Sequence, residues 1–293
     1  MTAPLEILAP GIRRLCAPNP SAMTGTGTNS YIVGTGTVAV IDPGPDLPAH
    51  LDAILCALSP AETVSHILVT HAHQDHSALA ARLATRTGAR ILAHGSAAEG
   101  RSAVMTGLAA SLPGGGEGLD LTFQPHQRLR HGDIVTGPDW SLRTLHTPGH
   151  LGGHLCFGLG QTLFSGDHVM AWSSSLISPP DGDMAAYMAS LRGLLTSEWS
   201  LFLPGHGPRV ADPAAQVQSL IRHRLNREAQ LLRALDQTPT PLGVLTQRVY
   251  TDTAPGLLAA AERNCLAHLI DLHDRNLVAA VTVAGSGTLF AGR

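Results

Sequence analysis

Residues 64–76 read Val64-Ser65-His66-Ile67-Leu68-Val69-Thr70-His71-Ala72-His73-Gln74-Asp75-His76. The first seven are mostly apolar or β-branched, which predicts a buried strand. The last six place three imidazoles and a carboxylate directly after it. A tight turn after a strand lets such side chains converge, whereas a helix offers only pairs about four residues apart. Imidazole nitrogen and carboxylate oxygen suit zinc and similar divalent ions, so the stretch predicts a metal site; a His-rich polar loop is the alternative.

Short β-type runs and helical patterns alternate on both sides of this stretch. Residues 29–33 and 37–41 flank Gly34-Thr35-Gly36 and predict a hairpin. Apolar residues at helical spacing over 47–58 and 78–86 predict helices on either side of the strand. Further β runs are expected at 90–93, 129–135, 141–145, 155–159, 161–164 and 201–204, with a helix at 184–195. Two β-rich halves interleaved with helices predict an α/β fold, a four-layer αββα sandwich.

Three of the later β runs are followed by a potential ligand that comes directly after a glycine. These pairs are Gly149-His150, Gly166-Asp167 and Gly205-His206. Glycine permits a sharp bend and a close approach of the backbone, which a Cβ would obstruct. The same device therefore recurs: a strand delivers a candidate ligand at a glycine turn.

Composition limits the class of protein. The chain has 293 residues, a formal net charge of -3 and 14% charged residues, so no global attraction to nucleic acid or anionic membrane is expected. All 19 cationic Lys or Arg side chains are Arg, which excludes lysine nucleophiles. The four cysteines are far apart among apolar neighbours and are predicted to be reduced core residues. Without a signal-like start or a long apolar run, a cytoplasmic protein with no membrane span is expected.

The composition changes near Pro213. Residues 213–238 are predicted to form a linking helix after a first domain at 1–212. Residues 239–293 then show two helical patterns and a β pair turned at Gly285-Ser286-Gly287. Two helices and a hairpin within about fifty residues resemble a winged-helix module. The C-terminal domain is therefore predicted to be an α+β, winged-helix-like domain.

The ordered motifs H-x-H-x-D-H, T-P-G-H, G-D and P-G-H-G resemble those of the metallo-beta-lactamase-fold hydrolases over about residues 31–208. The resemblance implies two divalent metal ions. It assigns His71, His73 and His150 to the first ion, and Asp75, His76 and His206 to the second, with Asp167 as the bridge. It also implies that Asp75 both binds metal and orients the attacking hydroxide as a catalytic residue.

This ligand set agrees with hydrolytic chemistry. Three neutral imidazoles leave an ion strongly Lewis acidic, so the pKa of its bound water falls toward neutrality. Two ions about 3.5 to 4 Å apart can share the resulting hydroxide. The lactamases that hydrolyse antibiotics differ, with a cysteine near the position of Asp167 and no counterpart of His76. Flavodiiron proteins carry Glu at the position of His73, so zinc is the expected metal, with manganese and iron left open.

Several other side chains are candidates for supporting roles. Asp42, in Ile-Asp-Pro-Gly, is expected to hydrogen-bond the loop bearing the first ligands. His154 is expected to orient or pack rather than bind metal, and His168 to point away from the site. Residues 172–175 could line a substrate cleft or form an ordinary loop. Arg222, Arg224 and Arg227 could bind an anionic group or form a solvated face.

The tail indicates a branch of the family. Residues 223–228, 249–252 and 257–272 resemble beta-lactamase-like protein two, which couples the hydrolase core to a winged helix and includes single-strand endoribonucleases and fungal polyketide thioesterases. The expected function is a dinuclear zinc-dependent hydrolase using a metal-bound hydroxide. Its substrate is a small-molecule ester or thioester, or single-stranded RNA. The 4% aromatic content and acidic charge weigh mildly against RNA.

Two alternatives stay open. A glyoxalase-two-like hydroxyacyl-thioester hydrolase has a similar site, but its helical tail does not suit the predicted hairpin. The winged helix could instead make the protein a binding module for nucleic acid or protein. A helix that reads DNA is usually basic, and the helix over about 255–273 is not. We therefore expect the winged helix to pack against the core or against a second subunit in a homodimer.

Overall fold

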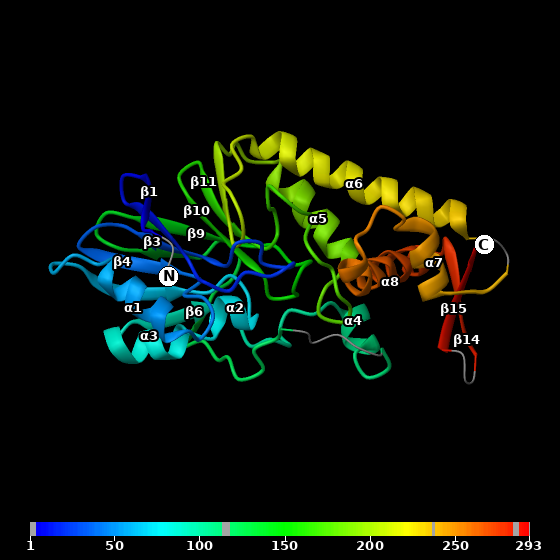
Figure 1. Cartoon of the computed structure of the whole chain (residues 1–293), viewed down its shortest axis with the longest axis horizontal. Coiled ribbons are helices and arrows are strands. Elements are labelled where there is room, and N and C mark those ends of the chain that lie inside the picture. Colours follow the sequence, from blue (N-terminus) through cyan, green and yellow to red (C-terminus); the bar gives the residue numbers. More distant parts are fainter. Residues whose placement is uncertain (1–3, 113–117, 236–237, 284–286, 293) are drawn as a thin grey trace.

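Two sheets face each other in the first two thirds of the chain, and helices cover their outer faces (Figure 1). The computed structural model describes residues 4–112, 118–235, 238–283 and 287–292.

The first sheet has the strand order β1-β2-β3-β4-β5-β6-β7. Pairing is antiparallel from β1 to β4 and parallel from β4 onward, so the buried strand β5 has parallel neighbours on both sides. The first two strands were not predicted. The bounds are β1 Glu6–Ala9, β2 Ile12–Cys16, β3 Asn29–Val33, β4 Thr37–Ile41, β5 Thr63–Leu68, β6 Arg90–Ala93 and β7 Gln127–Arg128.

The second sheet has the order β12-β11-β10-β9-β8, and only its β11–β12 pair is parallel. The predicted strand at 129–135 is wrong over most of its length. There the Arg130 N–H donates to Asp133 Oδ2 over 2.7 Å and Gly132 has φ +89°, so the chain turns. The bounds are β8 Ile134–Thr136, β9 Ser141–His146, β10 Leu155–Leu159, β11 Thr162–Gly166 and β12 Leu201–Pro204.

Alternation along the strands builds the layers. In β4, Val38 and Val40 pack toward the helices, whereas Ala39 and Ile41 pack between the sheets. Side chains of a strand point alternately to its two faces, so a strand buried on both sides is apolar throughout. A third cluster joins the outer face of the second sheet to its helices. The four-layer αββα sandwich is therefore confirmed.

Two of the longer helices begin where the local sequence favours a helix start. Asp183 and Asp212 each accept a hydrogen bond from a backbone N–H three residues later, and Pro213 occupies the first turn. Among the described residues, no helix is both long and apolar enough to cross a membrane. The helices of this part are α1 Pro48–Cys56, α2 Gln74–Ser77, α3 Ala80–Thr87, α4 Ala103–Leu108, α5 Met184–Leu194 and α6 Pro213–Ala234.

Helix α6 runs along one side of the molecule from the second sheet to the C-terminal part (Figure 1). Its first half packs Val217 and Leu220 against α5, whereas Leu231 joins the C-terminal core. That core also receives Met105 of α4, a helix that was not predicted. Helix α6 therefore contacts two separate cores.

The C-terminal part consists of helices and a small sheet of order β13-β15-β14, in which β13 precedes the helices and β14 and β15 follow them. Leu245, Leu269 and Phe290 contribute to its own buried core. The turn predicted at 285–287 lies mostly outside the described residues, and the strands on either side of it pair as expected. The bounds are β13 Thr240–Pro241, α7 Leu242–Val249, η1 Pro255–Leu257, α8 Leu258–Asp274, β14 Val278–Val283 and β15 Gly287–Gly292.

The cysteines only partly match the prediction. All four are free, and Cys156 and Cys265 are buried as expected. Cys16 is half-buried and Cys56 is exposed, so the prediction of four core residues is wrong for these two. Cys56 is the last residue of α1, whose buried residues are His50, Leu51 and Ile54.

Candidate metal centre

The loops that follow four strands bring together all seven side chains predicted as ligands. Residues 71–76 follow β5 and enter α2, and the other three loops follow β9, β11 and β12. The potential ligand atoms fall into three overlapping groups, each with its atoms within 4.8 Å of one another. The groups are His71, His73 and His150; His71, His76 and Asp167; and Asp75, His76 and His206.

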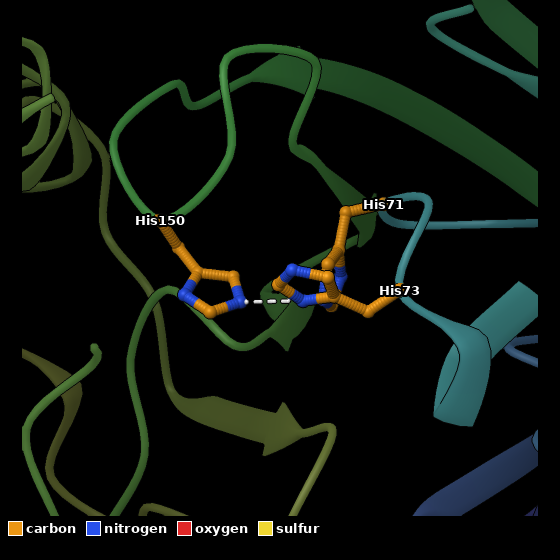
Figure 2. Close-up of side chains that lie close together, drawn as sticks. All are labelled: His71, His73 and His150. Atoms are coloured by element: carbon orange, nitrogen blue, oxygen red, sulfur yellow. Dashed lines mark hydrogen bonds between the residues drawn. The ribbon is translucent and has the colours of Figure 1, made fainter. Parts of the chain in front are cut away.

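The first group is a triangle of imidazoles (Figure 2). The His73 Nδ1 atom lies 2.9 Å from His71 Nε2 and 3.0 Å from His150 Nε2. Two of the rings come from one turn of the first sheet, and His150 comes from the second sheet. The centre is thus assembled across the sandwich.

The group of Asp75, His76 and His206, called the second group from here on, mixes carboxylate and imidazole. The Asp75 Oδ2 atom lies 3.5 Å from His76 Nε2 and 3.2 Å from His206 Nε2. The two imidazole nitrogens are themselves 3.2 Å apart. Asp75 is the most exposed member, with 28% of its side chain accessible, whereas His76 is fully buried. One edge of this group therefore faces solvent.

Asp167 lies between the two groups. Its Oδ2 is 3.7 Å from His150 Nε2 and 3.3 Å from His206 Nε2, and its Oδ1 is 3.4 Å from His76 Nε2. Although Oδ1 is buried, it makes no hydrogen bond with any described residue. A buried carboxylate oxygen without a hydrogen bond suits a cation, and in the metal-free state the protonated ring of His76, 3.4 Å away, is the cationic group beside it.

Glycines make room at this point. A Cβ on Gly205 would lie 2.5 Å from Asp167 Oδ1 and 2.6 Å from His76 Cε1. Gly166 has φ +49°, and a Cβ there would lie 2.7 Å from His154 Nε2. The glycines that precede Asp167 and His206 are therefore required sterically, as the sequence pattern suggested.

Hydrogen bonds to the Nδ1 atoms fix the orientation of several rings. Nδ1 of His150 is 2.7 Å from the Leu176 carbonyl oxygen, and Nδ1 of His206 is 3.2 Å from that of Gly27. An acceptor at Nδ1 selects the tautomer with its proton there, which leaves the Nε2 lone pair directed into the centre. The Nδ1 atom of His76 likewise has an acceptor, the Oδ2 atom of Asp42, 2.9 Å away.

Asp42 performs the supporting role predicted for it. Its carboxylate accepts hydrogen bonds from the Thr70 N–H at 2.7 Å and the Thr70 hydroxyl at 2.8 Å. Because that hydroxyl proton is committed to Asp42, its oxygen accepts from His71 Nδ1, 2.9 Å away. Asp42 thereby orients both His71 and His76. Thr70, which relays the bond, was missed in the sequence, although it directly precedes the motif.

The charges divide the centre into two parts. Burial and the neighbouring imidazoles lower the pKa of His71 well below its ordinary value and that of His73 to about 3, so both rings are neutral. Burial would also lower the pKa of His206, but the carboxylate of Asp167 outweighs it and raises the pKa to about 9. In the metal-free state, protons on His76 and His206 therefore offset the charge of Asp75 and Asp167.

The neighbouring histidines do not join these groups. His154 Nε2 accepts the Asp167 N–H at 3.2 Å, and its Nδ1 is 2.9 Å from the Thr147 hydroxyl. It orients the carboxylate's backbone, as predicted. His168 lies beside Tyr187, with ring centroids 4.8 Å apart, in the core under α5. It points away from the centre, also as predicted.

A hollow of about 450 Å³ lies next to the chain segment that follows His206, and none of the seven candidate ligands lines it. Trp172 lines it and is 42% exposed, whereas Ser175 is buried and does not line it. The indole lies against Gly207, the residue after His206, since a Cβ there would be 2.4 Å from Trp172 Cδ1. The other lining residues are Arg14, Cys16, Gly25, Thr26, Asn29 and Pro208.

The αββα sandwich and the His/Asp cluster between its sheets define a metal-dependent hydrolase as the class of protein. The family model described as the metallo-beta-lactamase superfamily matches residues 23–206, and that of the beta-lactamase associated winged helix domain matches residues 243–284. The chain belongs to the metallo-beta-lactamase superfamily and carries this winged helix domain at its C-terminal end.

The relatives extend this assignment. The Beta-lactamase-like protein 2 homolog of Drosophila melanogaster is 30% identical over 90% of this chain and 88% of its own length. An atrochrysone carboxyl ACP thioesterase of Aspergillus terreus is 30% identical over 79% of this chain, and the match spans 65% of that fungal protein.

Two solved structures are similar. A metallo-beta-lactamase family protein from Thermus thermophilus has a TM-score of 0.78 and 24% identity, over 98% of this chain and 100% of the other. A second, solved in a di-iron-bound form, has a TM-score of 0.50 and 29% identity, over 66% of this chain and 92% of the other. The first demonstrates that the fold of the whole chain, including its C-terminal part, is shared.

Proposed function

We propose that this hydrolase is a dinuclear zinc enzyme that cleaves an ester or thioester. The observation that carries the proposal is the place of Asp167, whose Oδ2 lies between His150 Nε2 and His206 Nε2 and whose Oδ1 faces His76 Nε2. A carboxylate has two oxygens that it can divide between two cations.

Two of the three groups, together with Asp167, supply the proposed ligands. His71, His73 and His150 would hold the first ion, and Asp75, His76 and His206 the second, with Asp167 between them. The orphaned Oδ1 of Asp167 and the directed Nε2 lone pairs fit such ions. Nitrogen-rich donors at the first position favour zinc, and the di-iron-bound relative makes iron the competing metal. When bound, the ions supply Lewis acidity and an acidified water.

Asp75 is the proposed catalytic residue. Burial alone would raise its pKa, but His76 and His206 lower it below the ordinary value, so the carboxylate stays ionised. The Thr28 hydroxyl donates to Asp75 Oδ2 over 3.2 Å and fixes its orientation. A partly exposed, oriented carboxylate can accept a proton from an attacking water and align it with the substrate carbonyl.

The hollow beside Trp172 supports an acyl substrate. Trp172 and Pro208 present apolar surface next to His206, which suits an acyl chain. Arg14, the one cationic side chain among its lining residues, pairs with Glu6 and donates to the Gly207 carbonyl at 3.2 Å. A phosphodiester backbone needs several available cations, so single-stranded RNA fits this hollow less well.

The thioesterase named among the fungal relatives agrees with this choice of substrate. The match to a winged helix domain argues against a glyoxalase-two-like enzyme, whose tail is helical.

Helix α8 weighs against a nucleic-acid-binding role for the winged helix. Its Ala267 packs into the cluster beneath α5, and its residue Arg263 donates to Ser178 Oγ over 2.9 Å. Arg275, just after the helix, pairs with Glu228 and Asp271. A recognition helix must be free to enter a groove, and this one is packed against the hydrolase part.

We propose the division 1–212 for the hydrolase domain, 213–238 for the linking helix and 239–293 for the winged helix domain. The two cores contacted by α6 support these bounds. We also propose a reducing, cytoplasmic location, which four free cysteines support.

The deciding experiment assays the metal-loaded protein in parallel on acyl-thioesters, lactones and single-stranded RNA. Turnover of the thioester or lactone above that of RNA is expected. Metal content is measured on the same samples. Two ions per chain are expected after zinc reconstitution, so one or fewer would overturn the dinuclear assignment, and turnover of RNA alone would overturn the ester or thioester assignment.

A further inference from the structure

Segment 175–178 lies between the first imidazole group and the C-terminal part. On one side, the Leu176 carbonyl oxygen is 2.7 Å from His150 Nδ1. Among the described residues, the His150 ring makes one other such contact, between its Nε2 atom and His73. The orientation of His150 therefore depends on where the Leu176 carbonyl lies.

On its other side, residues distant in sequence hold the same segment. The Asn264 Oδ1 atom accepts the Ile177 N–H at 3.0 Å, and Arg224 Nη2 donates to the Ser175 carbonyl. Arg224 Nη1 also donates to Asn264 Oδ1, at 3.1 Å. Leu176 is thus flanked by two anchored residues, one fixed by α6 and the other by α8.

Arg224 occupies an unusual place for a cation. It is 1% exposed, and no carboxylate in the described part of the chain forms an ion pair with it. Its guanidinium carbon lies 5.3 Å from the centroid of the Tyr187 ring. Burying a charge without a counter-ion is costly, so a well-packed apolar residue would serve stability better. The solvated face predicted for the arginines of this helix is therefore wrong for Arg224.

Asn264 is itself fixed. Its Nδ2 donates to the Ala260 carbonyl at 3.3 Å, which turns Oδ1 toward the Ile177 N–H and Arg224. Its amide therefore bridges α8, α6 and segment 175–178. The contrast with His71 is clear, because that ring is oriented through Asp42 within the first sheet.

We infer that the linking helix and the winged helix domain position a metal ligand: Arg224 and Asn264 hold segment 175–178 so that Leu176 orients His150. The inference rests on the proposed role of His150 as a ligand of the first ion. It gives the C-terminal domain a part in building the hydrolase site, in which its residues act through the Leu176 carbonyl and touch neither metal nor substrate.

The test compares zinc affinity in variants of the full chain. Asn264→Ala and Arg224→Met each remove an anchor of the segment, and competition with a chromophoric chelator measures the zinc retained. One of the two ions should bind about tenfold more weakly in both variants, since residues that orient a ligand typically contribute 10- to 100-fold. Asn264→Asp keeps an acceptor oxygen for Ile177 and Arg224, and should restore affinity to within about twofold of wild type.

Arg227→Met is the matched control. Arg227 lies one turn from Arg224, where it donates to the Val249 carbonyl at 2.7 Å and pairs with Asp252 at 2.7 Å. It does not contact segment 175–178 and should leave zinc affinity unchanged. Cobalt-substituted samples provide a second readout, because the d–d bands report ligand geometry. These bands should change in Asn264→Ala and not in Arg227→Met.

The outcomes separate this inference from the proposed function. If wild type retains two ions and Asn264→Ala binds both as tightly as Arg227→Met, the positioning role is wrong and the hydrolase proposal stands. If wild type retains no zinc, the ligand assignment fails and the inference with it. Arg224→Met removes a buried side chain, so thermal melting checks its fold, and Asn264→Ala decides the case if that variant unfolds.

Discussion

Asp42 and His76 form a buried contact of 2.9 Å between Oδ2 and Nδ1, with side-chain exposures of 3% and 0%. The same carboxylate accepts hydrogen bonds from the N–H and the hydroxyl of Thr70. One aspartate therefore orients His76 directly and His71 through Thr70. Asp42 has φ +49°, which a non-glycine residue rarely adopts. The hydrogen bonds compensate this backbone conformation, and the position therefore tolerates little change.

Replacing Asp42 by Asn should weaken zinc binding by about 10- to 100-fold. An amide offers one acceptor oxygen in place of two, and its NH₂ group would face the donors at Thr70 or His76. Chelator competition checks the result. Asp46→Asn, which loses only an exposed ion pair with Arg82, is the control and should bind zinc like wild type. Equal affinity in the two variants would contradict the orienting role.

Replacing Asp167 by Ala should remove at least one ion and abolish turnover. The loss should exceed the roughly 100-fold that substitution of a residue merely supporting a ligand causes, because both proposed metal positions lose an oxygen. Elemental analysis of the purified variant counts the metal, and a thioester assay measures turnover. A variant that retains two ions and wild-type activity would refute the bridge.

The stability of the metal-free protein should fall as the pH rises from about 6.5 to about 9. His206 has its folded pKa raised to about 9, and that of His76 is also raised. Between the ordinary value of 6.5 and the folded value, the folded state holds protons that the unfolded state has lost. This contribution is complete below pH 6.5 and is lost as the pH rises through about 9.

Thermal melting of metal-free and zinc-loaded samples at several pH values checks this expectation. Zinc on these nitrogens replaces the proton, so the decline should be absent from the loaded protein. Zinc binding at pH 7 should also release protons, measurable in a weakly buffered titration. A metal-free protein whose melting temperature rises steadily from about pH 6.5 to 9 would contradict the proposed pairing.

Gly205→Ala should disrupt the second group of ligands. The new methyl group would contact Asp167 Oδ1 at 2.5 Å and His76 Cε1 at 2.6 Å, both distances below any normal contact. Zinc content and melting temperature should both fall. Gly193→Ala in α5 is the control, since a Cβ there has no neighbour within 4 Å and alanine favours a helix by about 0.5–1 kcal/mol.

Trp172→Ala should raise KM for acyl-thioesters with long or aromatic acyl groups by about tenfold and leave acetyl-thioester KM nearly unchanged. The indole provides apolar surface for the acyl chain, and a lost apolar contact of this size corresponds to about 1–3 kcal/mol. Trp172→Phe keeps much of that surface, so its KM for these substrates should lie between those of wild type and Trp172→Ala. An equal change for short and long substrates would place the acyl group elsewhere.

The ligand groups were predictable because their pattern is local. Four of the seven residues lie between His71 and His76, and each of the others follows a glycine at the end of a β run. Strands buried on both faces are apolar throughout, so polar side chains at their ends stand out. The contrast between apolar runs and the polar or glycine residues around them also predicted the bounds of β3, β4, β6 and β12 to within a residue or two.

Other features depend on segments that meet only in the folded chain. Strand β2 carries Arg13 and Arg14, both half-buried, between its apolar residues, so it lacks a clear apolar signal. Arg224 resembles its neighbours Arg222 and Arg227 in sequence, and no local signal separates them. It is buried because Ser175, 49 residues earlier, and Asn264, 40 residues later, both lie beside it.

Residue order therefore determines which donors exist and at which strand ends they appear, because strand periodicity and glycine turns act over a few residues. The pairing of those donors across two sheets, and the anchoring of His150 by the C-terminal domain, depend on long-range packing. Hydrogen bonds such as that from Ile177 to Asn264 join residues 87 positions apart, and no short-range pattern encodes them.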